Sequence, residues 1–155
     1  QMDEYLKFGE LDADQEKYNL LENTAENENI PWCQANGATF LAYSALAQGV
    51  LTGTVVPGVR YKSDDIRSMN PLFEEKTVVK INDMLKKFFI PLTQKYNCTM
   101  TQLVIAALIS VESVVALCGA RNVAEAQENA LAGDIEIRKE DLDILKKCVK
   151  DNFSL

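Results

Sequence analysis

The chain has 155 residues, of which 47% are hydrophobic and 25% charged, and its formal net charge is −7. This length and composition indicate a soluble globular unit with one sizeable core and disfavour a disordered chain. Because the net charge is negative and no run of Lys or Arg exceeds two residues, we expect neither nucleic acid nor an acidic membrane surface as a partner.

The four cysteines form no CxxC pair, and the chain contains no histidine. We therefore expect no metal site, and reduced, mostly buried thiols in a cytoplasmic protein. No apolar run reaches about 18 residues and no signal-peptide pattern occurs, so neither membrane insertion nor secretion is expected.

In the first half of the chain, the predicted elements are a helix over residues 2–8, a strand near 12–18, a helix from Asn23 or Thr24 to about Asn36, and a strand over 38–43. Gly9 and Gly37 follow the two helices, and glycine commonly ends a helix. Pro31 predicts a shift or break near the middle of the second helix.

Residues 49–72 form a long connection that holds several Gly and Pro residues. Connections of this length are usually functional lids or mobile segments. Within it, adjacent Asp64 and Asp65 do not converge on a magnesium ion, and we expect Asp65 to form an ion pair with Arg67.

In the second half, the predicted elements are an amphipathic helix from about Phe73 to Tyr96, an apolar helix over Leu103 to Ile109, a strand over 114–117, a helix from Asn122 through Leu131 and a last helix over about 139–149. Pro91 should kink the first helix, and Thr99 to Gln102 match a capping box for the second. Strands that alternate with helices predict a parallel sheet. The loops after the strands then gather on one face, where Gln15, Tyr43 and Gly119 should meet.

The segment from Gly119 to Asn122 is typical of an anion-binding loop that opens a helix. Gly119 permits close backbone approach, Asn122 is a good N-cap, and Arg121 is a fork-shaped donor beside the first amides of the helix. On these residues alone, an ordinary turn between a strand and a helix is the more common explanation.

Residues 40–53, which run from Phe40-Leu41-Ala42-Tyr43-Ser44 to Gly53, are similar to the strand-seven pattern AYSPLAQGLLTGK of aldo-keto reductases. Three more segments resemble the family in the same order: residues 15–21 resemble QxEYNLL, residues 65–73 resemble the loop after strand seven, and residues 119–129 resemble GARNPEQLEEN. The resemblance implies an α/β fold, namely the C-terminal half of a TIM (β/α)₈ barrel. The chain is then a single partial domain over residues 1–155, and residues 49–72 supply a cofactor belt.

The resemblance also implies a cofactor site. In the family, the position of Gln15 holds the nicotinamide carboxamide and that of Tyr43 stacks on the nicotinamide ring. The pyrophosphate is wrapped by the segment that contains Ser44, Leu46, Gln48, Gly49 and Leu51. The adenosine end is bound around Gly119, Arg121, Glu125, Glu128 and Asn129. NADP is the usual cofactor, but NAD stays open because the Glu125 carboxylate would repel a 2′-phosphate and would accept a hydrogen bond from a free 2′-hydroxyl.

The family's catalytic Asp, Tyr, Lys and His lie on the first four barrel strands, and no segment of this chain matches those strands. We therefore expect the cofactor-binding half of an NAD(P)H-dependent reductase of small carbonyl compounds, with no catalytic residue in this chain. The alternative is a non-catalytic nucleotide-binding half-barrel or a regulatory subunit that resembles the potassium-channel β-subunits. Half a barrel has unpaired edge strands and an inner apolar face, expected to include Phe40, Ala42, Val115 and Leu117, so an N-terminal half or a second copy should cover it.

Overall fold

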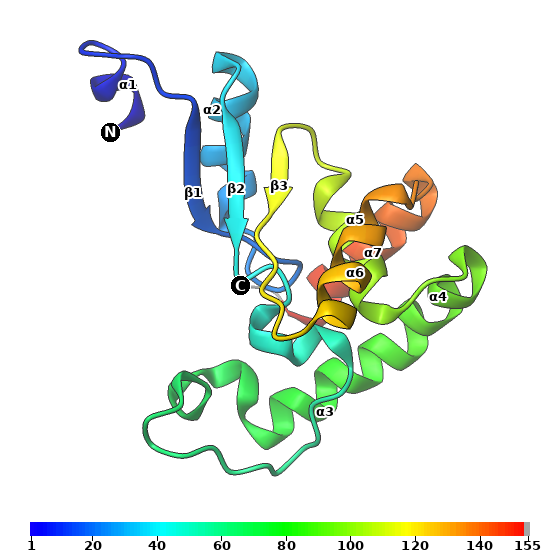
Figure 1. Ribbon diagram of the computed structural model, residues 1–155. Helices are drawn as coiled ribbons and strands as arrows, with labels where there is room; N and C mark the ends of the chain where they lie inside the picture. Colours follow the sequence, from blue (N-terminus) through cyan, green and yellow to red (C-terminus); the bar gives the residue numbers. More distant parts are fainter. Residues whose placement is uncertain (154–155) are drawn as a thin grey trace.

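The computed structural model describes residues 1–153 and arranges them around a sheet of three parallel strands (Figure 1). The helices and strands are α1 (Met2–Tyr5), β1 (Ala13–Lys17), α2 (Asn29–Asn36), β2 (Thr39–Tyr43), α3 (Glu75–Met84), α4 (Ile90–Tyr96), α5 (Met100–Ile109), β3 (Val114–Ala116), α6 (Val123–Leu131) and α7 (Lys139–Asn152). The carboxyl ends of the three strands point the same way, toward the loops that precede α3 and α6.

The strands lie in the order β1-β2-β3, and both pairings are parallel, as the alternation of strands and helices predicts. Lys17 pairs with Tyr43 at the carboxyl end of β1, and Leu41 pairs with Val115 between β2 and β3. Each crossover carries helices, which pack on one face of the sheet: α2 contacts β1 and β2, and α5 contacts β3.

The four apolar residues predicted to share one face of the sheet are divided between its two faces. Phe40 and Ala42 have no exposed surface because they face the helices, whereas Val115 and Leu117 are 46% and 40% exposed. Side chains alternate between faces along a strand, and the register pairs Val115 with Leu41 instead of Phe40. The open face therefore carries Val115 and Leu117 but not Phe40 or Ala42, and the prediction that all four share it was wrong.

Helix boundaries near the N-terminus follow local chemistry. The helix predicted over residues 2–8 covers only Met2–Tyr5, and since α1 has no buried residue and Leu6 and Phe8 are exposed, no core contact supports a longer helix. The next predicted helix divides into a short 3₁₀ turn (Thr24–Glu26) and α2. Pro31 lies in the first turn of α2, where its missing N–H costs nothing, so the break falls just before this turn instead of at the proline. Gly37 ends α2 with φ of 69°, as predicted.

The long amphipathic helix is interrupted at the place that Pro91 predicts. Residues Leu85–Phe89 form a π-helical turn between α3 and α4, and the Ile90 N–H donates to the carbonyl of Leu85. Pro91 cannot donate to the carbonyl of Lys87, and its ring would collide with that carbonyl in a regular α-helix. The wider turn relieves this conflict and keeps Phe89 in the core.

Helix α5 lies in the middle of the core, as its apolar sequence predicts. The Thr99 side chain accepts the Gln102 N–H, and the Gln102 side chain accepts the Thr99 N–H, so the capping box is formed. Every residue from 103 to 108 is buried. This helix contacts β3, α4, α6 and the turn at Ala47–Thr52, and it thus supports the loops at the carboxyl end of the sheet.

Helices α4 and α7 are joined by a buried carboxylate. Asp141, which is 5% exposed, accepts a hydrogen bond from Lys95 at 2.6 Å and another from the hydroxyl of Tyr96. The same hydroxyl accepts the backbone N–H of Arg138 at 2.9 Å. Lys95 and Tyr96 hold the pKa of Asp141 below its usual range, because their hydrogen bonds favour the ionised form.

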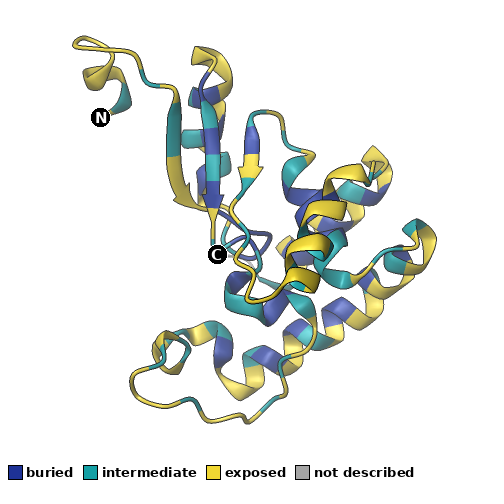
Figure 2. Cartoon of the chain, viewed as in Figure 1, coloured by how far each residue is buried: buried dark blue, intermediate teal, exposed yellow. Residues whose placement is uncertain are grey.

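The long connection has no buried residue from 53 to 70 and lies at the edge of the molecule (Figure 2). It contains short 3₁₀ turns at Ile66–Met69 and Pro71–Phe73. The predicted ion pair is present, because the Arg67 guanidinium lies 2.5 Å from the Asp65 carboxylate. Arg67 also stacks on Tyr61, whose ring packs edge-on against Phe73, so this exposed segment is tied to the core at one end.

Candidate functional site

A cavity of about 690 Å³ lies at the carboxyl ends of β2 and β3. Two segments that are far apart in the sequence line most of it, one within residues 44–54 and the other within residues 117–129, and Thr101 of α5 also contributes. Nine of the predicted cofactor residues line this cavity: Ser44, Leu46, Gln48, Gly49, Gly119, Arg121, Glu125, Glu128 and Asn129. The parallel sheet is what brings them together, since loops after parallel strands emerge at the same edge.

The other three predicted residues lie outside this cavity. Gln15 and Tyr43 lie on the open face of the sheet, since the register places them on the face of Leu41 and Val115, and Tyr43 is 41% exposed. Leu117, which is exposed on the same face, lines the cavity, so the open face borders the cavity. Leu51, in contrast, is fully buried. The turn at Ala47–Thr52 directs its side chain into the core, and Leu51 does not line the cavity as the sequence led us to expect.

The backbone of residues 44–49 has an unusual conformation. Ser44, Ala47 and Gln48 have φ values of 61°, 48° and 55°, and Gly49 has φ of 95°. The left-handed region costs an L-residue about 1–2 kcal/mol, and only surrounding contacts can maintain three such residues in one short segment. Strain of this kind is commonly found at ligand-binding segments, so the backbone itself marks this segment as a candidate site.

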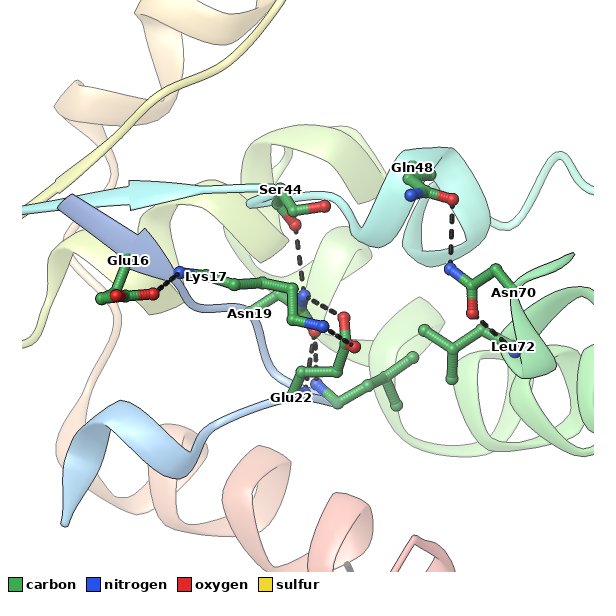
Figure 3. Close-up of polar contacts among 9 residues, drawn as sticks. Glu16, Lys17, Asn19, Glu22, Ser44, Gln48, Asn70 and Leu72 are labelled. Carbon is green, nitrogen blue, oxygen red and sulfur yellow. Dashed lines mark hydrogen bonds and ion pairs between the residues drawn. The ribbon is translucent and has the colours of Figure 1, made fainter. Parts of the chain in front are cut away.

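Asn19 is one of the contacts that hold this segment (Figure 3). Its side chain has no exposed surface and makes four hydrogen bonds. The amide oxygen accepts the N–H groups of Leu21 and Glu22, and the amide nitrogen donates to the Glu22 carboxylate and, at 3.2 Å, to the Ser44 carbonyl. Asn19 therefore fixes the loop after β1 to the loop after β2.

Asn70 is the second contact. Its amide nitrogen donates to the Gln48 side chain at 3.1 Å, and its amide oxygen accepts the Leu72 N–H at 2.9 Å (Figure 3). The far end of the long connection is thus tied back to the cavity wall near its start. The sequence analysis does not predict Asn19 or Asn70 as site residues. Asn70-Pro71 is a recognisable helix-start signal, and Asn19 lies in the segment that resembles QxEYNLL.

The second cavity wall is the start of α6 and the loop before it. The Asn122 side chain accepts the Glu125 N–H at 2.9 Å, which confirms Asn122 as the predicted N-cap. The Asn129 amide donates to the Gly119 carbonyl at 3.1 Å and so closes the loop against the helix. This contact leaves the amide oxygen of Asn129 and the carboxylate of Glu128 as acceptors on the cavity wall.

Arg121 is not a free cation. Its backbone N–H donates to the Glu125 carboxylate at 2.8 Å, and its guanidinium lies 3.2 Å from the other oxygen of that carboxylate. These two contacts, the backbone one first, hold the pKa of Glu125 below its usual range, because they favour the ionised form. From the sequence, Arg121 is expected to attract a phosphate and Glu125 to repel one. In the structure the two residues are hydrogen-bonded to each other.

The remaining chemistry of the described residues is limited. Cys118 lines the cavity between Leu117 and Gly119, and burial raises the pKa of its thiol, so this cysteine is a weak nucleophile. Among residues 1–153, no cluster of His, Cys, Asp and Glu could hold a metal ion. Within the same residues, none of the helices has the length and apolarity needed to cross a membrane. The cavity thus offers backbone and side-chain amides and hydroxyls to a polar ligand, and its charged groups are two carboxylates and one guanidinium.

Comparison with known proteins was consistent with this geometry. A model described as "Aldo/keto reductase family" matches residues 2–150. The NADH-specific methylglyoxal reductase of Escherichia coli is 34% identical over 145 residues, which cover 93% of this chain and 44% of that protein. The aldo-keto reductase YhdN of Bacillus subtilis is 33% identical over 75 residues, which cover 48% of this chain and 23% of that protein.

Two solved structures have the same fold. The glycerol dehydrogenase of Gluconobacter oxydans superposes with a TM-score of 0.90 at 24% identity, covering 97% of this chain and 46% of that one. An aldo/keto reductase of Klebsiella pneumoniae, in complex with NADP and acetate, superposes with a TM-score of 0.59 at 24% identity, covering 87% of this chain and 38% of that one. The chain spans less than half the length of these relatives, and its α/β fold with a parallel sheet matches aldo-keto reductase TIM barrels over part of their length.

Proposed function

The chain belongs to the aldo/keto reductase family, and we propose that it is the dinucleotide-binding part of a carbonyl-reducing enzyme. The observation that carries this proposal is the single cavity of about 690 Å³ into which residues 44–54 and residues 117–129 both project. Cavities of roughly 300–1,000 Å³ are usual for small-molecule and cofactor sites. A volume in this range, lined by glycine backbone and amides near residues 44–49 and by one guanidinium and two carboxylates near α6, would suit the pyrophosphate at the first wall and the adenosine at the second.

The residues present fit such a ligand from end to end. A side chain at Gly119 or Gly49 would meet no other atom within 4 Å, so the space beside these two backbones is open to a ligand. The Ser44 hydroxyl and the backbone near Gly49 would contact the pyrophosphate, and Leu46 and Gln48 would cover it. Glu128 and Asn129 would accept hydrogen bonds from the adenine amino group. The nicotinamide would extend onto the open face, where Tyr43 would stack on it and Gln15 would hold its carboxamide.

Within this proposal, residues 1–155 act as one partial domain, and residues 49–72 act as a belt over the pyrophosphate. The left-handed residues from Ser44 to Gln48, and their attachment to Asn19 and Asn70, would keep the belt ready for the ligand at little further cost in ordering. A bound dinucleotide would supply the hydride for reduction of a small carbonyl substrate. The proton donor would come from outside this chain, which has no histidine and no acid–base pair in the cavity.

The open face of the sheet supports a further part of the proposal. Tyr43, Val115 and Leu117 are each 40% or more exposed there, which is unusual for neighbouring apolar side chains of a sheet. We expect further barrel strands, or a second copy of this chain, to cover this face. Such a covering element would also bring the catalytic groups next to Tyr43.

The comparisons are compatible with either NAD or NADP as the cofactor, because one relative is named NADH-specific and a structure of similar fold was solved with NADP. The test is calorimetry of the full-length protein with NADH and NADPH, followed by an assay of cofactor oxidation with methylglyoxal, the substrate in the name of the Escherichia coli relative. The proposal predicts a single site per chain for at least one dinucleotide, together with turnover. Binding without turnover on any small carbonyl would favour the non-catalytic alternative, and no binding would refute the proposal.

A further inference from the structure

We propose that Glu125 makes the adenosine end of the cavity selective for a ribose with a free 2′-hydroxyl, so that NADH is the preferred cofactor of this protein. The inference rests on the proposed dinucleotide site and adds a selection that the shape of the cavity alone does not provide. It depends on where the hydrogen-bond donors at the start of α6 are already engaged.

The first observation is that Glu125 is held at the cavity wall by hydrogen bonds at the start of α6. Its carboxylate accepts the Arg121 backbone N–H at 2.8 Å and lies 3.2 Å from the Arg121 guanidinium. The Glu125 N–H, which would otherwise point outward from the first turn of α6, donates to Asn122 at 2.9 Å. Three donors near the helix start are thus engaged within the protein, so without breaking these contacts a 2′-phosphate could reach only the remaining N–H groups of the exposed Arg121 guanidinium.

The second observation is the charge of the cavity wall. Of the described residues that line the cavity, Arg121 is the only cation, and Glu125 and Glu128 are both acidic. A 2′-phosphate adds a charge of about −1.5 to −2 at neutral pH. Placed next to these carboxylates, it would meet net repulsion, because two carboxylates face it and only one guanidinium attracts it.

A free ribose hydroxyl has the opposite requirement. It can donate a hydrogen bond to a carboxylate, as acidic residues do for the ribose of NAD in other dinucleotide folds. The two Arg121 contacts fix the Glu125 carboxylate at the cavity wall, where it can accept such a bond. Arg121 then acts as a positioning residue, which holds the carboxylate at the cavity wall, and Glu125 determines the specificity.

The test is a fluorescence titration of the full-length protein with NADH and with NADPH, for the wild type and three variants. The wild type should bind NADH more tightly than NADPH. Glu125→Gln should raise NADPH affinity about tenfold or more, the size expected when a charge-assisted contact replaces a repulsive one, and should change NADH affinity much less. Glu125→Asp, which keeps the charge, should retain the preference for NADH. Glu136→Gln removes one exposed charge outside the cavity and should leave the ratio of affinities unchanged.

Salt provides a second measurement that needs no variant. Because salt screens the repulsion, the difference between the affinities for NADH and NADPH should become smaller as ionic strength rises from about 0.01 to 0.5 M. Tighter binding of NADPH by the wild type, or an unchanged ratio in Glu125→Gln, would overturn this inference and leave the dinucleotide site intact. Binding of neither dinucleotide would instead refute the proposed function itself.

Discussion

Replacing Asn19 with alanine should destabilise the protein more than its single amide group would suggest. The substitution removes four hydrogen bonds, and the partner groups differ in whether they keep another hydrogen bond. The Ser44 carbonyl still accepts the Ala47 N–H, and the Glu22 N–H still donates to the backbone carbonyl of residue 19. The Leu21 N–H has only the Asn19 side chain, in a residue that is 1% exposed, so it becomes a buried donor without a partner.

One buried unsatisfied N–H costs about 1–3 kcal/mol, and with the other lost contacts we expect about 2–4 kcal/mol for Asn19→Ala. At an m-value of about 2 kcal/mol per M, this loss lowers the urea midpoint by about 1–2 M. Asn36→Ala is the matched control, because that amide makes one exposed hydrogen bond to the Trp32 carbonyl. Equal midpoints for the two variants would refute the view that Asn19 fixes the loops after β1 and β2.

Three further predictions use other contacts. Asp141→Asn should lower the urea midpoint at pH 7. Because Lys95 and Tyr96 lower the pKa of Asp141, the difference in midpoint between wild type and variant should be complete above about pH 4 and should shrink as the pH falls further. A difference that does not change with pH would contradict the ion pair. Asn70→Ala should raise the dinucleotide dissociation rate, measured by stopped flow, by about three- to tenfold because the contact with Gln48 is lost. The control Ser68→Ala, at an exposed residue, should leave this rate unchanged, and equal rates for the two variants would show that the belt is held without Asn70. The 155-residue chain produced alone should show no reductase activity and should associate in light scattering, and the double substitution of Val115 and Leu117 by Ser should reduce this association; a monodisperse 17.3 kDa monomer with turnover would refute the half-barrel account.

Features that depend on residues close together in the chain could be predicted from the sequence. The capping box at Thr99, the end of α2 at Gly37, the cap at Asn122 and the Asp65–Arg67 pair depend on residues a few positions apart, and all were predicted. The parallel sheet followed from the alternation of elements, and the ordered motifs identified the family.

Features that depend on register or on distant partners could not be predicted in the same way. A shift of one position in β3 decides whether Val115 or Val114 faces the helices, and the apolar run 114–117 does not show which. The burial of Leu51 follows from left-handed residues that no propensity favours, and these are maintained by Asn19 and Asn70 from other parts of the chain. The Arg121–Glu125 contact spans only one helical turn, but the sequence does not show that the carboxylate also accepts the Arg121 backbone N–H.

Hydrogen–deuterium exchange of the full-length protein, with and without NADH, tests the central claim most directly, because it locates the ligand on the chain. The account predicts slower exchange on binding in two segments, residues 44–54 and 117–129, with a smaller effect at the strand end near Tyr43. Exchange over α7, which lies outside the cavity, should not change. Protection confined to other segments, or none at saturating NADH and NADPH, would contradict the assignment of this cavity as the dinucleotide site.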